Sequence, residues 1–151
     1  MITNLTISLE DAKTAVSAAL AAAKPDDGPI AVCVTNENGD PAYLVRQDGA
    51  SATDVRNAER KAYTAAFIGR DTSAYRLQIA HDGRTVADWS DAMITTLHGG
   101  WTLRRGSQVI GGIGVAGSGG EDRDERLALA GAEAAAQLAV DAWRAQRKPR
   151  P

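Results

Sequence analysis

Three glycines in the C-terminal half of the chain stand at the spacing of a phosphate-binding loop. Gly112, Gly114 and Gly117 match the pattern G-x-G-x-x-G, and the helix-forming stretch EDRDERLALAG follows them. Glycines at this spacing let a nucleotide pyrophosphate approach the backbone where a helix begins. The same glycines can instead serve close packing alone, so the pattern has two interpretations.

The residues around these glycines favour packing. A dinucleotide fingerprint places its glycines in the turn between a strand and a helix, and a further strand follows that helix. Here no further strand follows, and no Gly-Lys-Ser/Thr completes a P-loop. Gly112 and Gly114 instead alternate with Ile113 and Val115, which predicts one smooth face of a strand. Such a face admits either a helix or a flat ligand at close range.

Three polar side chains are candidates for acid–base catalysis. His98 precedes Gly99 and Gly100, where an imidazole has space to ligate iron or to transfer protons near neutral pH. Lys61 borders the buried stripe of a predicted helix, and Asp48 opens the segment DGA. Asp48 either caps a turn or holds Lys61 in its charged form. His98 can instead be an ordinary surface histidine, and Lys61 can be a lysine that points into solvent.

Aromatic, basic and glycine residues extend this set toward a ligand. Tyr63 and Trp101 can stack on a flat ligand, although such side chains more often lie in a core or at a subunit contact. The candidate ligand-binding residues are Gly99, Gly100, Trp101, Tyr63, Arg46, Gly112 and Gly114. His81 and His98 have no carboxylate neighbour at helical spacing, so the sequence predicts no zinc or iron box. His98 is a candidate metal ligand only if haem is bound.

Three helices follow from hydrophobic periodicity. Apolar residues recur at intervals of three and four over about 8–24, 51–69 and 122–147. Ser8 and Ser51 are predicted N-caps of the first two helices, because each is followed three residues later by an aspartate.

Two hairpins complete the predicted elements. Apolar runs flank turn-forming residues over 30–47 and again over 99–117, where Gly106 and Ser107 close the turn. Residues 71–97 have no clear period: TSAYRLQIAH can be a short helix, and DWSDAMITTL another short helix or a loop. The predicted fold class is α/β in the α+β sense, an antiparallel sheet flanked by helices in the order α-β-β-α-(α)-β-β-α.

Composition excludes several classes of function. Seventeen Lys and Arg against nineteen Asp and Glu give a formal net charge of -2, so neither nucleic acid nor a membrane is a predicted partner. No apolar stretch approaches the ~20 residues of a membrane span. The lone Cys33 lies in the apolar run PIAVCV and fits a reducing compartment, so we expect a cytoplasmic protein. The 151 residues predict one domain over 1–151, with its core at about 5–147 and a frayed tail at 148–151.

Several motifs follow one another in order along nearly the whole chain. They are DGA after the second predicted strand, AERKAYTAAF with TS beyond it, and GGWTLRRGSQVIGGIGVAGSGGEDRDERLALAG. Together they resemble the GlcG/HbpS family of small domains, also described as haem-degrading. The resemblance implies a profilin-like fold, assembly into homo-oligomers, and binding of haem or a related tetrapyrrole, or a place beside glycolate and diol metabolism. Glu59, Arg60, Trp101, Ala116 and His98 depart from the family pattern, which indicates a specialised ligand.

Three hypotheses of different classes remain. The first is a small oligomeric protein that binds haem or a related tetrapyrrole, with His98 or a neighbouring group at the iron and a basic side chain at the propionates. The second is a cofactor-independent enzyme acting on a small oxygenated metabolite, with Asp48, Lys61 and His98 as acid–base groups and a pocket near the His98-Gly99-Gly100 loop. The third is a structural oligomer whose glycine face serves packing alone.

Overall fold

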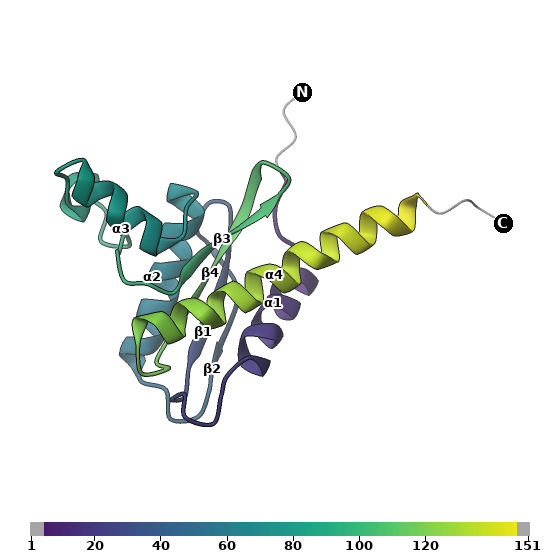
Figure 1. Ribbon diagram of the computed structural model, residues 1–151, viewed down its shortest axis with the longest axis horizontal. Coiled ribbons are helices and arrows are strands. Elements are labelled where there is room, and N and C mark those ends of the chain that lie inside the picture. The colour runs from purple at the N-terminus through teal and green to yellow at the C-terminus, as the bar shows by residue number, and fades with distance from the viewer. Residues whose placement is uncertain (1–4, 148–151) are drawn as a thin grey trace.

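A four-stranded antiparallel sheet forms the centre of the protein. The computed structural model describes residues 5–147, and the tail predicted over 148–151 lies outside them. The strands are β1 Ala31–Asn36, β2 Pro41–Arg46, β3 Gly100–Arg105 and β4 Gln108–Ala116, in the order β2-β1-β4-β3. Each predicted hairpin forms one half of the sheet, and β1 pairs with β4 across the middle (Figure 1). The predicted α+β fold class is confirmed.

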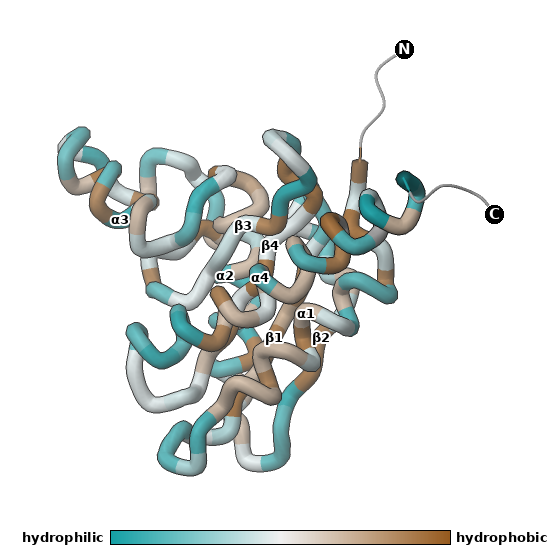
Figure 2. Tube along the Cα trace, turned by 45° about the vertical axis from the view of Figure 1, so that its right-hand side comes forward, coloured by the Kyte–Doolittle hydropathy of each residue, from teal (hydrophilic) through white to brown (hydrophobic). Residues whose placement is uncertain are grey.

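Helices cover both faces of this sheet. They are α1 Leu9–Ala21, α2 Ala52–Ile68, α3 Thr72–His81 and α4 Glu121–Gln146, with a short 3-10 helix, η1, at Val86–Trp89. α2 packs on one face, whereas α1 and α4 pack together on the other (Figure 1). The main apolar core lies between the sheet and the α1–α4 pair, and Figure 2 shows hydrophobic residues along this middle region. No described helix is long and apolar enough to cross a membrane.

Local capping sets where the helices begin. The Ser8 hydroxyl accepts a backbone N–H of the first turn of α1 at 3.0 Å, and Ser51 and Asp54 form a reciprocal capping box at the start of α2. α2 ends at Gly69, which adopts the left-handed conformation with φ of 73°, and Asp71 then caps α3. TSAYRLQIAH is therefore a helix, whereas DWSDAMITTL contains the end of η1 and continues as irregular chain.

The smooth face of β4 receives α2. A Cβ on Gly112 would overlap the carbonyl oxygen of Ala62, and a Cβ on Gly114 would overlap that of Ala58. The backbone nitrogen of Ala62 would also lie only 2.6 Å from the added Cβ at Gly114. The two glycines therefore let a helix backbone rest directly on a strand backbone, and both lie beneath α2 rather than on a pocket among the described residues.

Candidate functional site

Lys61 is buried, and its ammonium group is hydrogen-bonded within the chain. Its side chain is 3% exposed, and Nζ donates to the Val115 carbonyl oxygen at 2.8 Å and to Asp124 Oδ2 at 2.9 Å. The other oxygen of Asp124 accepts the Ser118 N–H at 3.1 Å and the Ser118 hydroxyl. Lys61 therefore ties α2 to the end of β4 and to the first turn of α4.

Of the two interpretations of Asp48, the structure agrees with the turn and not with the pairing to Lys61. Asp48 lies in an exposed turn after β2, and the carboxylate that contacts Lys61 is Asp124. Arg46 is also exposed, at the last position of β2. The DGA segment forms a turn ahead of the α2 cap, so its aspartate faces solvent while the lysine points into the protein. Among residues 5–147, no hydrogen bond or ion pair joins Asp48 to Lys61 or His98, so the proposed acid–base set does not assemble.

The loop before β3 passes over this ion pair and requires its two glycines. Gly99 has φ of 113°, and a Cβ there would lie 2.7 Å from the Val115 carbonyl oxygen and 3.1 Å from Lys61 Nζ. A Cβ on Gly100 would overlap the Lys61 carbonyl oxygen. The Val115 N–H donates to the Gly99 carbonyl at 2.9 Å, and the Gly100 N–H donates to the Thr72 hydroxyl at 3.1 Å. The glycines thereby fix the backbone that carries the preceding imidazole.

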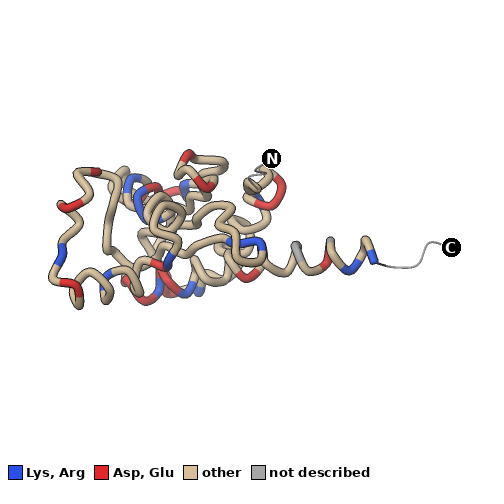
Figure 3. The backbone as a smooth tube through the Cα atoms, turned by 90° about the horizontal axis from the view of Figure 1, so that it is seen from above, with Lys and Arg blue, Asp and Glu red and all other residues tan. Residues whose placement is uncertain are grey.

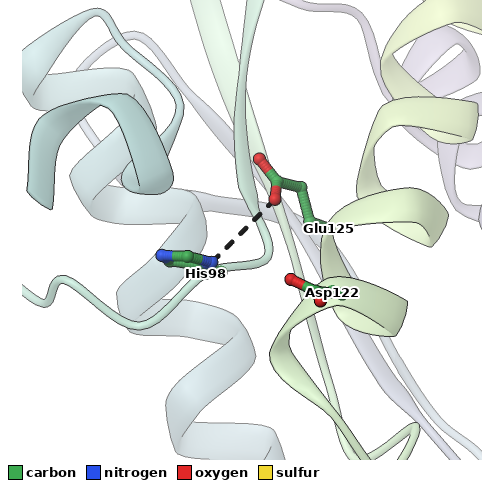
Figure 4. A group of neighbouring side chains, drawn as sticks. All are labelled: His98, Asp122 and Glu125. Atoms are coloured by element: carbon green, nitrogen blue, oxygen red, sulfur yellow. Dashed lines mark ion pairs between the residues drawn. The ribbon is translucent and has the colours of Figure 1, made fainter. Parts of the chain in front are cut away.

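The imidazole of His98 lies beside the first turn of α4 (Figure 4). Its Nδ1 lies 3.9 Å from Glu121 Oε2 and 4.0 Å from Glu125 Oε2. The side chain is 22% exposed, but Nδ1 itself is shielded from solvent and has no hydrogen-bond partner in the described part of the chain. Ligand atoms of His98, Asp122 and Glu125 all lie within 4.8 Å of one another. The fold therefore joins His98 to three carboxylates from one helix.

Arg76 of α3 neutralises one of these carboxylates. Its guanidinium donates to the two oxygens of Glu121 at 2.9 and 3.1 Å and to the Thr96 carbonyl at 3.0 Å. Hydrogen bonding and the positive charge of Arg76, together with a backbone hydrogen bond from His98, hold the pKa of Glu121 below its ordinary value against the opposing effect of burial. Asp122 and Glu125 have no arginine or lysine partner among the described residues.

Sequence reasoning missed the carboxylates that meet Lys61 and His98. As first-turn acids of a helix they are already explained by the helix dipole, so their types alone raise no question. Asp122 and Glu125 stand three residues apart, a spacing that puts both on one face of a helix, and Asp124 lies on another face. The spacing of Asp122 and Glu125 is the one feature of the sequence that could have indicated a shared site. It becomes informative only once the fold places the His98 loop beside this helix face.

The two aromatic candidates lie on opposite faces of the sheet. The Tyr63 hydroxyl donates to Asp91 at 2.6 Å, which raises the pKa of Tyr63, and its ring stacks on Phe67 with centroids 6.0 Å apart. Trp101 is partly buried on β3 and packs against the main core on the α4 side of the sheet. Tyr63 belongs to α2, which covers the opposite face, so no single flat ligand is sandwiched by both rings.

An aromatic cleft that the sequence did not predict lies between the end of α2, α3 and η1. It has a volume of about 500 Å³, and its apolar lining includes Phe67, Ile79 and Trp89. Phe67 and Trp89 meet edge to face with centroids 5.3 Å apart, and both rings are about half exposed. Two arginines, Arg70 and Arg84, and two aspartates, Asp82 and Asp88, also line it. We call this feature the aromatic cleft.

Comparison with known proteins places the chain in a family. The HbpS-like family, described as haem degrading protein HbpS-like, matches residues 7–133. The chain therefore belongs to the HbpS-like family, and the resemblance drawn from its motifs is confirmed. A search of curated proteins found no match.

Solved structures agree with this assignment. A double mutant of Streptomyces reticuli HbpS is 32% identical, with a TM-score of 0.79 over 88% of this chain and 89% of that chain. Protein ORFY of Klebsiella pneumoniae is 21% identical, with a TM-score of 0.78 over 89% of this chain and 94% of that one. A PduOC:heme complex is 23% identical, with a TM-score of 0.76 over 86% and 95%. The last two likenesses show the fold alone.

Proposed function

We propose that this protein binds haem or a related tetrapyrrole, and that the aromatic cleft holds it. The family description and the haem complex of PduOC support the ligand class. The observation that carries the location is the combination of apolar rings and free cations in one cleft. Such a site suits a flat, apolar ring that bears carboxylates, because aromatic faces cover the ring and guanidinium groups bind the carboxylates. Bound haem supplies one-electron and O₂ chemistry.

The His98 site fits haem poorly by comparison. The carboxylates of Glu121, Asp122 and Glu125 surround its imidazole and would repel the propionates. The aromatic cleft also contains two carboxylates, Asp82 and Asp88, but its two arginines balance their charge. Arg70 and Arg84 have no ion pair or side-chain hydrogen bond within residues 5–147. These free guanidinium groups are therefore available to an anionic ligand.

Tyr75 is the one lining residue of the cleft whose type ligates haem iron in proteins. It is almost fully buried, and its hydroxyl accepts a hydrogen bond from Trp89 Nε1 at 2.7 Å. Direct ligation by Tyr75 would replace this hydrogen bond. We therefore propose that the cleft binds the tetrapyrrole ring and its carboxylates, and that the Tyr75 hydroxyl is the oxygen available to ligate the iron.

The double variant Arg70→Gln/Arg84→Gln is expected to weaken hemin binding at least tenfold, because each lost charge-assisted contact to a carboxylate contributes roughly 1.5–3 kcal/mol. The measurement is a titration followed by the Soret band. Arg46→Gln is the matched control, since Arg46 is an exposed arginine at the end of the edge strand β2 and does not line the cleft, and it should bind hemin like the parent.

His98→Ala provides the opposite arm of this test. If the cleft holds haem, this variant keeps the Soret band of the parent. If His98→Ala abolishes the band while Arg70→Gln/Arg84→Gln retains it, haem lies at His98 and the cleft assignment is wrong. Absence of hemin binding by the folded parent protein would overturn the proposed function itself.

We also propose that the chain assembles with copies of itself and acts in the cytoplasm. α4 is 26 residues long, about 39 Å at the usual rise of ~1.5 Å per residue, and its last turns project beyond the other helices and strands (Figure 3). These turns carry Val140 and Trp143, which are 42% and 53% exposed. The proposed cytoplasmic location rests on Cys33, which is a buried thiol without a disulfide partner, as is usual in a reducing compartment. Burial and the charge of Glu59 raise the pKa of this thiol to about 12.

Light scattering at micromolar concentration is expected to give a mass that is a multiple of the chain mass of 15.8 kDa. Trp143→Glu should shift this mass toward the single chain, because a charge would be buried in the contact. A monomeric mass for the parent at every concentration would contradict self-assembly. An unchanged oligomer in the variant would place the contact elsewhere.

A further inference from the structure

We propose that His98, Asp122 and Glu125 bind one divalent transition-metal ion of the Zn²⁺ class, at a site separate from the aromatic cleft. An imidazole nitrogen with two carboxylates is a donor set used by Zn²⁺, Mn²⁺ and Fe²⁺. The donor atoms lie within 4.8 Å of one another. The distance from His98 Nδ1 to Glu125 Oε2 is 4.0 Å. Tetrahedral Zn²⁺ with bonds of about 2.0–2.2 Å holds neighbouring donor atoms about 3.4 Å apart, so the two side chains must approach each other by roughly half an ångström to bind one ion.

The orphaned nitrogen of His98 is the first argument for a cation. Nδ1 is shielded from solvent, lies beyond hydrogen-bond distance of the nearest carboxylate oxygens, and has no other partner among the described residues. Figure 4 shows this nitrogen directed toward Glu125 on α4. A buried polar atom without a partner is uncommon in folded proteins and calls for an explanation. A metal ion bound between the ring and the carboxylates supplies the missing partner.

The balance of charge is the second argument. Arg76 pairs with Glu121 through two hydrogen bonds, so the negative charge of Glu121 is already neutralised. Asp122 and Glu125 remain, with two formal negative charges beside the imidazole and no cationic side chain paired with them in the described chain. The N-terminus of α4 contributes only about half a positive charge. The local field therefore suits a divalent cation.

Contacts behind the ligands hold them in place. The Ser73 hydroxyl contacts a Glu125 oxygen and also lies 2.7 Å from Asp71 Oδ2. A hydroxyl has one proton, so it donates to only one of these two carboxylates at a time. Asp71 therefore adds further negative charge behind Glu125, and Ser73 orients the Glu125 carboxylate. Neighbours of this kind around metal ligands commonly fix ligand orientation and tune affinity.

The backbone of the site is also held rigidly. The loop that carries His98 is fixed by the hydrogen bonds of Gly99 and Gly100. The first turn of α4 is fixed by the contact of Asp124 with Lys61. Ligand positions therefore depend mainly on side-chain rotamers, and small rotations of Asp122 and Glu125 bring both carboxylates to one ion.

Calorimetric titration of the metal-free, untagged full chain with Zn²⁺ tests the site, with Co²⁺ absorption as a second readout. We expect one ion per chain. Asp122→Asn and Glu125→Gln should each weaken binding at least tenfold, and His98→Ala should weaken it further. At equal Zn²⁺ concentration, the Tm of the parent should rise more than that of Glu125→Gln.

Two matched controls separate this site from adventitious binding. His81→Ala removes an exposed histidine of α3, and Glu133→Gln removes an exposed carboxylate of α4, so both should bind Zn²⁺ like the parent. Failure of the parent to bind Zn²⁺ or Co²⁺ would overturn the proposal, as would equal affinity in Glu125→Gln and Glu133→Gln. Asp122→Asn and Glu125→Gln keep side-chain volume and hydrogen-bonding capacity, so the test stands even if His98→Ala fails to fold. Hemin binding should be unchanged in Glu125→Gln.

Discussion

Replacing Lys61 with methionine is expected to lower the free energy of unfolding by about 3–5 kcal/mol, the usual effect of breaking a buried ion pair. The reason is that Asp124, whose side chain is only 9% exposed, would keep its charge in the interior with Ser118 as its remaining partner. Methionine fills nearly the same space, so the loss reports charge rather than a cavity. Urea denaturation of the purified variant measures the change.

Two further variants define the cause. Lys24→Met is the matched control, because Lys24 is exposed and its loss should change the free energy of unfolding by less than about 0.5 kcal/mol. Lys61→Met/Asp124→Asn should recover part of the lost stability, since the uncompensated negative charge is removed together with its partner. If Lys61→Met unfolds at the same urea concentration as the parent, the ion pair contributes nothing to the fold.

Gly114→Val is expected to lower stability by about 3 kcal/mol or more, at or beyond the upper end of the usual overpacking effect. An added Cβ alone would overlap the Ala58 carbonyl oxygen and lie 2.6 Å from the Ala62 nitrogen. Both obstacles are backbone atoms of α2, so no side-chain rotation relieves the overlap. The helix would have to move away from the sheet, and thermal unfolding would show a lower Tm.

A graded series distinguishes this collision from a general effect of replacing glycine. Gly114→Ala should destabilise less than Gly114→Val, because it adds one atom instead of three. Gly120→Ala should cost only about 0.5–1 kcal/mol, the effect of a poor N-cap residue, since Gly120 is the N-cap of α4 and an added Cβ there meets nothing closer than an Arg123 carbon at 3.9 Å. Equal stability of the parent and Gly114→Val would show that α2 does not rest on this strand.

The fold was largely predictable because its signals are local. Ser8 and Ser51 cap helices through residues three positions away, and Gly106 with Ser107 closes a hairpin between adjacent strands. α3 was harder to predict because only Thr72 and Tyr75 of its residues are buried. A helix with so little buried surface leaves almost no hydrophobic period in the sequence.

The site was harder to predict because it depends on contacts between distant segments. His98 was identified from its residue type and from the glycines that follow it. Its carboxylate neighbours begin 23 positions later, at Glu121, and Lys61 meets Asp124 across 63 positions. Nothing local distinguishes Asp124 from the other acids that begin α4. The aromatic cleft likewise depends on where η1 returns toward α2, which residue periodicity cannot determine.

The small buried surface of α3 and η1 has a consequence for how the aromatic cleft behaves over time. One wall of the cleft belongs to α2, which is anchored on the sheet, whereas η1 has no buried residue and α3 has two. Segments with so few buried contacts open by local fluctuation at free energies well below that of global unfolding. The cleft can therefore widen and admit a bulky ligand while the sheet stays intact. We also expect substitutions in this outer wall to destabilise the fold less than substitutions in the sheet, so a changed wall can alter the ligand while the folded state is kept.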